Sequence, residues 1–148
     1  MSETAVTVRL TQAQDYRFDV HFGGELPALR VDEPPPLGQG SGPSPVQLLA
    51  ASVGNCLSAS LLFALRKFKQ TPEPIHSEVT AEVGRNAEGR LRVLSMAATL
   101  TLGVPAARLE HLDRVLASFE AYCTVTQSVG QGIPVTTRVL DAEGRVLK

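Results

Sequence analysis

The two cysteines, Cys56 and Cys123, are the residues of this chain with the most reactive side chains. Cys56 lies inside a long apolar stretch, where a free cysteine is often only a small hydrophobic side chain. Cys123 lies where one expected helix ends and a shorter one begins, and a helix N-terminus stabilises a thiolate. In a reducing compartment such a pair is more often redox-active than structural, provided that the two Cα atoms lie within about 7 Å. The sequence does not give that distance, so both interpretations stay open.

The histidines point to no catalytic arrangement. His21 and His76 occupy the polar positions of alternating segments, and His111 follows Glu110 in a charged stretch, so we expect all three at the surface. With two cysteines, three histidines and no CxxC motif, we expect no metal site.

Composition excludes several classes of protein. The chain has 148 residues, of which 43% are hydrophobic and 20% charged, and this predicts a single domain spanning residues 1–148 with its own core. A net charge of −1 gives no general attraction to nucleic acid or to an anionic membrane. No uninterrupted apolar run approaches the roughly 20 residues of a membrane span, and no signal peptide is visible. We therefore expect a cytosolic protein with neither nucleic acid nor membrane as partner.

The first thirty residues predict strands. Apolar and polar residues alternate over residues 6–10 and again over residues 16–22, which is typical of half-buried strands, and residues 12–15 suit the turn between them. A third strand is expected over residues 28–31. Residues 32–44 are rich in Pro and Gly and predict a connecting loop. Its glycines do not have the GxGxxG spacing, and no Lys-Ser or Lys-Thr pair follows them. We therefore expect no phosphate site.

A long helix is expected to begin at Pro45. Ser44 can cap it and Gln47 completes a capping box, and nothing but Gly54 weakens the helix before about Lys69. The segment is apolar almost all round, which indicates burial on more than one side. A domain of this size rarely buries such a helix alone, so we expect a second subunit.

The remaining segments predict an α+β fold. Strands are expected over residues 75–83 and around residues 96–102, joined by a turn over residues 85–90. Leu, Val and Phe recur at helical spacing over residues 109–119, in a helix that begins near Pro105. A short helix or turn then runs to about Gly130, and a last strand covers residues 135–140. The expected order is β-β-β-α-β-β-α-β.

Two motifs give the sequence a family resemblance. The run PSPVQLLAASVGNC, which ends at Cys56, resembles the loop-to-helix signature of the OsmC/Ohr family of osmotically inducible and organic hydroperoxide resistance proteins. The run EAYCTVTQS, which contains Cys123, resembles the second cysteine motif of that family. The resemblance extends over nearly the whole order of elements. It implies an intertwined homodimer in which long central helices pack against the sheets of both subunits.

The resemblance also implies an activity, the thiol-dependent reduction of organic hydroperoxides. Cys56 corresponds to the peroxidatic thiolate and Cys123 to the resolving thiol. A thiolate that displaces alkoxide from a hydroperoxide becomes a sulfenic acid, which condenses with a second thiol to a disulfide. An external dithiol restores both thiols, and no bound cofactor is needed.

The sequence departs from the family pattern at the start of the long helix. Val46 stands where the well-characterised peroxidases have a glutamate that holds an arginine beside the thiolate. Arg17 is the nearest counterpart of that arginine, and Glu120 could supply a carboxylate near Cys123. Without this arginine–glutamate pair, fewer charges stabilise the Cys56 thiolate, and we expect a less depressed pKa. The chain resembles the branch of the family that lacks the helix-start glutamate. The alternative function is a small-molecule or lipid-binding dimer of the same fold with non-catalytic cysteines, which the apolar surroundings expected for Cys56 favour.

Overall fold

The computed structural model describes residues 3–148 and divides the chain into two compact units, Met1–Leu48 and Leu49–Lys148. The expectation of one domain over residues 1–148 stays a prediction.

The first unit contains a three-stranded antiparallel sheet. Its strands are β1 (Arg9–Gln14), β2 (Arg17–His21) and β3 (Leu29–Val31), in the order β1-β2-β3. Three strands form as expected, but the first is misplaced: residues 6–8 lie outside β1, which instead includes residues 12–14 of the expected turn, and the turn falls at Asp15 and Tyr16. The expected half-burial of the first strand is wrong, because every residue of β1 is exposed. Alternation identifies the apolar face of a strand, but not whether another part of the protein covers it.

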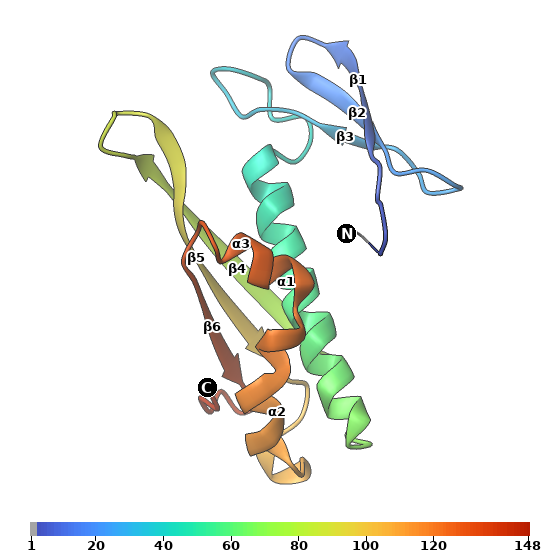
Figure 1. Ribbon diagram of the computed structural model, residues 1–148, viewed down its shortest axis with the longest axis vertical. Coiled ribbons are helices and arrows are strands. Elements are labelled where there is room, and N and C mark those ends of the chain that lie inside the picture. Colours follow the sequence, from blue (N-terminus) through green and yellow to red (C-terminus); the bar gives the residue numbers. More distant parts are fainter. Residues whose placement is uncertain (1–2) are drawn as a thin grey trace. The chain divides into compact units, whose positions relative to one another are not determined.

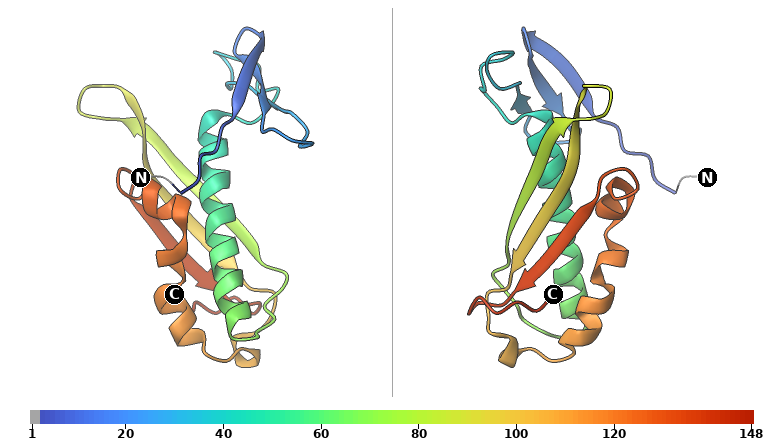
Figure 2. Two further views of the ribbon diagram at one scale, coloured as in Figure 1. Left: turned by 45° about the vertical axis from the view of Figure 1, so that its right-hand side comes forward. Right: turned by 90° about the vertical axis from the view of Figure 1, so that its left-hand side faces the viewer.

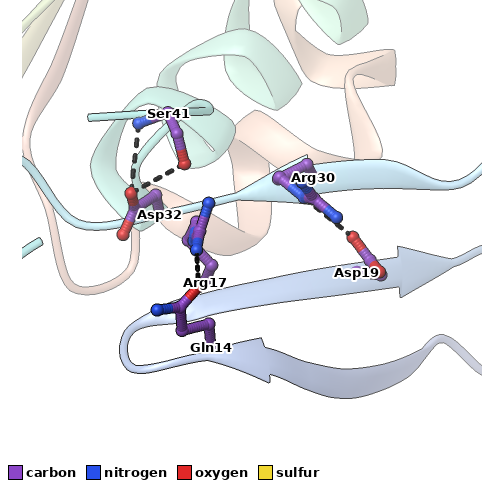
Figure 3. A network of polar contacts seen from close by, with 6 residues as sticks. All are labelled: Gln14, Arg17, Asp19, Arg30, Asp32 and Ser41. Carbon is purple, nitrogen blue, oxygen red and sulfur yellow. Dashed lines mark hydrogen bonds and ion pairs between the residues drawn. The ribbon is translucent and has the colours of Figure 1, made fainter. Parts of the chain in front are cut away.

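The loop after β3 is organised by one buried carboxylate, that of Asp32 (Figure 3). It accepts hydrogen bonds from the backbone N–H groups of Glu33 (2.8 Å), Gln39 (3.2 Å) and Ser41 (3.1 Å), and a fourth from the Ser41 hydroxyl at 2.9 Å. A Cβ at Gly38 would lie 2.2 Å from the carbonyl oxygen of Glu33, so glycine is needed there for close approach. In this loop the amides of Gln39 and Ser41 are therefore bound to Asp32, whereas those of Gly38 and Gly40 donate to the backbone carbonyls of Pro34 and Glu33.

The long helix α1 (Pro45–Lys67) begins where the sequence predicts (Figure 1). The capping box is formed: Ser44 Oγ accepts from the Gln47 N–H at 3.2 Å, and Gln47 Oε1 accepts from the Ser44 N–H at 2.9 Å. Val53, Leu57 and Leu61 are fully buried at four-residue spacing, whereas Phe63 is 65% exposed. By length and composition alone α1 could cross a membrane, but a core helix of a soluble protein passes the same test.

The second unit contains a sheet of order β4-β5-β6, made of β4 (His76–Arg85), β5 (Leu91–Thr101) and β6 (Val135–Leu140). β4 and β5 form an antiparallel hairpin, and β6 pairs with β5 in parallel. A parallel pair needs a crossover connection, and here the segment between β5 and β6 provides it. Helix α1 and this crossover lie on the same side of the sheet (Figure 2). Gly54 of α1 allows close packing on β4, since a Cβ there would lie 2.9 Å from Cγ2 of Val79.

The crossover corrects one sequence expectation. The single helix expected from Pro105 to Phe119 is wrong, because the chain forms a 3₁₀ turn at Ala106–Arg108, then α2 (Leu112–Ser118), then a second 3₁₀ turn at Phe119–Tyr122. His111 adopts a left-handed conformation (φ 60°), which separates the first turn from α2. The short helix expected after Cys123 is confirmed as α3 (Thr124–Val129). The α+β class and the order of the strands are as expected. The segment expected as a short helix or turn before the last strand is the helix α3.

Candidate thiol site

The two cysteines come from different elements of the second unit and belong to its core. Cys56 lies in α1 beside fully buried Leu57 and is itself half-buried against the core. Cys123 has 0% exposure and immediately precedes α3. The Cys56 side chain lies near enough to Cys123 to raise the pKa of its thiol. Both thiols are free, and both belong to the same core, so the structure places near each other the two residues whose relation the sequence left open.

The surroundings of Cys123 favour its neutral form. Burial and the nearby Cys56 side chain raise the pKa of the Cys123 thiol, and they outweigh the hydroxyl and the backbone N–H of Thr126, which lower it. Stabilisation of the thiolate by a helix N-terminus, as the sequence position suggested, is therefore not the dominant effect. Helix α3 has only six residues. Burial destabilises the thiolate more than the N-terminus of so short a helix stabilises it.

Thr126 is the residue of this site that the sequence analysis missed. The Cys123 thiol donates a hydrogen bond to Oγ1 of Thr126 at 2.9 Å, and Thr126 is itself buried. The spacing offered only an indirect signal, since the side chain that precedes a helix commonly bonds to the backbone N–H of the residue three positions later, whereas here the partner is the Thr126 side chain. That signal is weak for cysteine, which is a poor donor and acceptor.

The two supporting residues named from the sequence have other partners. Arg17 lies in β2 of the first unit, where its guanidinium donates to Oε1 of Gln14 (Figure 3). Glu120 forms an ion pair with Lys148, whose Nζ lies 3.2 Å from Oε2 of Glu120. The backbone carbonyl of Glu120 accepts a hydrogen bond from the Cys123 N–H at 3.0 Å. Glu120 thus helps to hold the backbone of Cys123, while its carboxylate is bound to a lysine.

The histidines lie at the surface as expected. His21, His76 and His111 are all exposed, and the ring of His111 stacks on Phe68 with 4.7 Å between centroids. Over residues 3–148, no group of three or more His, Cys, Asp or Glu side chains could hold a metal ion. The Cys56–Cys123 pair is therefore the arrangement in this fold that we consider for chemistry.

Comparison with known proteins now decides the family. The model of the OsmC-like protein family matches residues 38–138, which is more than half of the chain and includes both cysteines. The chain belongs to the OsmC-like family. No curated protein matches the sequence. The predicted family and fold class are confirmed.

Solved structures share the fold at low sequence identity. An OsmC-like protein of Vibrio cholerae is 14% identical with a TM-score of 0.77, over 93% of this chain and 99% of its own. An organic hydroperoxide resistance protein of Legionella pneumophila is 16% identical with a TM-score of 0.71, over 94% and 98%. The organic hydroperoxide resistance protein OhrB of Bacillus subtilis is 13% identical with a TM-score of 0.67, over 93% and 99%. These likenesses extend over nearly the whole chain in each case.

Proposed function

We propose that this OsmC-like protein reduces organic hydroperoxides, with Cys56 as the attacking thiolate and Cys123 as the resolving thiol. The observation that supports the proposal most directly is that a half-buried and a fully buried thiol belong to the same core, with Cys56 near enough to raise the pKa of Cys123. A thiol that meets a substrate must be reachable, and Cys56 is the more accessible of the two. A resolving thiol needs only to reach its partner sulfur, so complete burial is compatible with that role.

The proposed reaction uses only these two side chains, the peroxide and an external dithiol. The Cys56 thiolate attacks the terminal oxygen of the hydroperoxide, the O–O bond breaks, and the alkoxide takes up a proton and leaves as an alcohol. The resulting sulfenic acid reacts with the Cys123 thiol, forming the disulfide and releasing water. A dithiol then reduces the disulfide in two exchange steps and is itself oxidised.

The same proposal includes a homodimer in the cytoplasm. Phe63, on the outer side of α1, is 65% exposed, and on β5 the side chains of Leu91 and Leu94 are 59% and 46% exposed. Large apolar side chains that one chain leaves open are typical of surfaces that a second subunit covers. A thiol pair that acts by cycling between dithiol and disulfide suits a reducing compartment.

The test is turnover of cumene hydroperoxide with a dithiol as reductant. We expect Cys56→Ser to lower the rate by at least about a hundredfold, because serine is a far weaker nucleophile than a thiolate. Cys123→Ser should leave Cys56 trapped as a sulfenic acid, which dimedone labels and mass spectrometry detects. The control is Ser128→Ala, at an exposed position of α3. If excess hydroperoxide leaves both wild-type thiols unmodified, the proposal fails and a binding dimer with non-catalytic cysteines replaces it.

A further inference from the structure

The complete burial of Cys123 raises the question of how its proton is exchanged with water. Closing a disulfide removes the proton of this thiol, and opening the disulfide returns it. With 0% exposure the sulfur cannot meet water directly. A neighbouring side chain must therefore take part in the proton transfer. Cys56 itself reacts in this step, and Thr126 is hydrogen-bonded to the sulfur.

Thr126 has the position and the chemistry for that transfer. Its Oγ1 lies 2.9 Å from Sγ of Cys123, and a hydroxyl can accept one proton while it donates another. Thr126 is 7% exposed, so it reaches a little further outward than Cys123. Thr126 also lines a polar pocket of about 190 Å³, together with Glu120, Gln127 and Gln131. A pocket of this size with several polar partners can hold water.

We propose that the Thr126 hydroxyl relays the proton of Cys123 to and from this pocket and stabilises the Cys123 thiolate while it exists. This inference rests on the proposed redox role of the pair. During disulfide formation, Cys123 transfers its proton to Oγ1 as the hydroxyl proton passes to water in the pocket. The freed sulfur attacks Cys56, and the hydroxide that leaves the sulfenic acid takes up a proton as water.

Reduction of the disulfide uses the same proton transfer in reverse. Accessibility determines which of the two sulfurs the reductant attacks. The external thiolate attacks Cys56, because Cys123 is fully shielded and Cys56 is not. The disulfide bond breaks with its electron pair on Cys123, and Thr126 donates a hydrogen bond and then a proton to this leaving thiolate. The second thiol of the reductant then releases Cys56 from the mixed disulfide. The better leaving group is thus the sulfur beside the Thr126 hydroxyl, which accepts from the thiol at 2.9 Å and can reorient to donate to the thiolate.

The experiment measures the reduction of a disulfide that no peroxide has made. Diamide oxidises the wild-type protein, and dithiothreitol then reduces it while the free thiols are counted over time. We expect Thr126→Val to slow reduction by about tenfold, as loss of one hydrogen bond to a charged sulfur predicts. Thr126→Ser retains the hydroxyl and should stay within about twofold of the wild type. Thr136→Val, at an exposed position of β6, is the matched control for the loss of a threonine hydroxyl.

A second measurement separates the hydroxyl from packing. In a Cys56→Ala background, Cys123 is the only thiol left, and the ultraviolet absorbance of its thiolate reports its titration. Adding Thr126→Val should raise the pKa of Cys123 further, and adding Thr126→Ser should not, because only valine removes the donor. Thermal unfolding of each variant checks that it is folded.

The outcomes distinguish the relay from the peroxidase proposal. If Thr126→Val is reduced as fast as the wild type, or if Thr126→Ser is slowed equally, the relay is wrong. If the wild type forms no disulfide with diamide, both the relay and the redox pair are wrong. If the disulfide forms with diamide but not with cumene hydroperoxide, the proposed peroxidase function fails, while the reduction rates still decide the relay.

Discussion

Asp141 and Cys123 are both buried ionisable residues, yet their pKa values move in opposite senses. Asp141 is 2% exposed, and its carboxylate accepts hydrogen bonds from the backbone N–H groups of Ala106 (2.9 Å), Glu143 (3.0 Å) and Arg145 (2.9 Å). The Ala106 bond is the largest of the effects that lower the pKa of Asp141, and burial only partly opposes them. At Cys123, burial prevails and the pKa is raised.

Part of the difference is the number of donors that face each group; in addition, Cys56 raises the pKa of Cys123 and the charge of Arg145 lowers that of Asp141. Three amides point at Asp141, whereas a single residue, Thr126, supplies the donors that favour the Cys123 thiolate. Asp32 agrees with this rule: burial opposes its ionisation, but its four hydrogen bonds prevail and lower the pKa. Burial by itself therefore does not decide whether a group is charged, and the local supply of N–H and O–H donors does.

The largest expected effect comes from breaking the Asp141 site. Asp141→Asn retains one acceptor oxygen and puts an NH₂ group against a backbone N–H, so at least one of the three bonds is lost. Since Asp141 joins the end of β6 to the 3₁₀ turn at Ala106, we expect a melting temperature several degrees lower at neutral pH. The control is Glu143→Gln, at an exposed position two residues away, which should leave the melting temperature nearly unchanged. Equal melting temperatures for Asp141→Asn and wild type would contradict the assigned role.

A smaller effect is expected in the acid dependence of stability. Because the folded pKa of Asp141 lies below its unfolded value, the unfolded chain binds the proton first as the pH falls. The stabilisation is complete above the unfolded pKa of about 3.9 and is lost as the pH falls through the folded pKa. Denaturant titrations should show a shallower acid decline in Asp141→Asn than in the wild type. If stability falls equally steeply with pH in both proteins, other carboxylates account for the acid dependence, and Asp32 is the first candidate.

The smallest effect is expected at the alkaline end, from Cys123. Its folded pKa is raised, so the unfolded chain loses the proton first, and stability falls as the pH rises above the unfolded value of about 8.5. Cys123→Ser removes this titration and should flatten the alkaline decline, while its acid decline stays like that of the wild type. The measurement is the same denaturant titration under reducing conditions. A Cys123→Ser protein with an unchanged alkaline slope would contradict a buried, neutral thiol.

Several parts of the fold could be predicted because their signals are local. The capping box of Ser44 and Gln47 fixes the start of α1, and the bounds of β6 follow from its pattern of apolar and β-branched residues. The break between Pro105 and Phe119 could not be predicted. The Ala106 N–H bonds to Asp141, which is 35 residues distant, and the left-handed His111 interrupts an otherwise regular helical spacing. A helix is predicted from the periodicity of apolar residues. A hydrogen bond to a residue far along the chain leaves that periodicity unchanged.

The family, the α+β class and the two residues on which the proposed chemistry depends could be read from the sequence alone. The two cysteines, the motifs that flank them and the helix that bears Cys56 are all local properties of the chain. The structure was needed to show that both thiols belong to one core, that Cys56 is the more accessible and that Cys123 bonds to Thr126. Burial and the direction of a pKa shift depend on which distant segments pack around a group, and a linear pattern of residues does not contain that information.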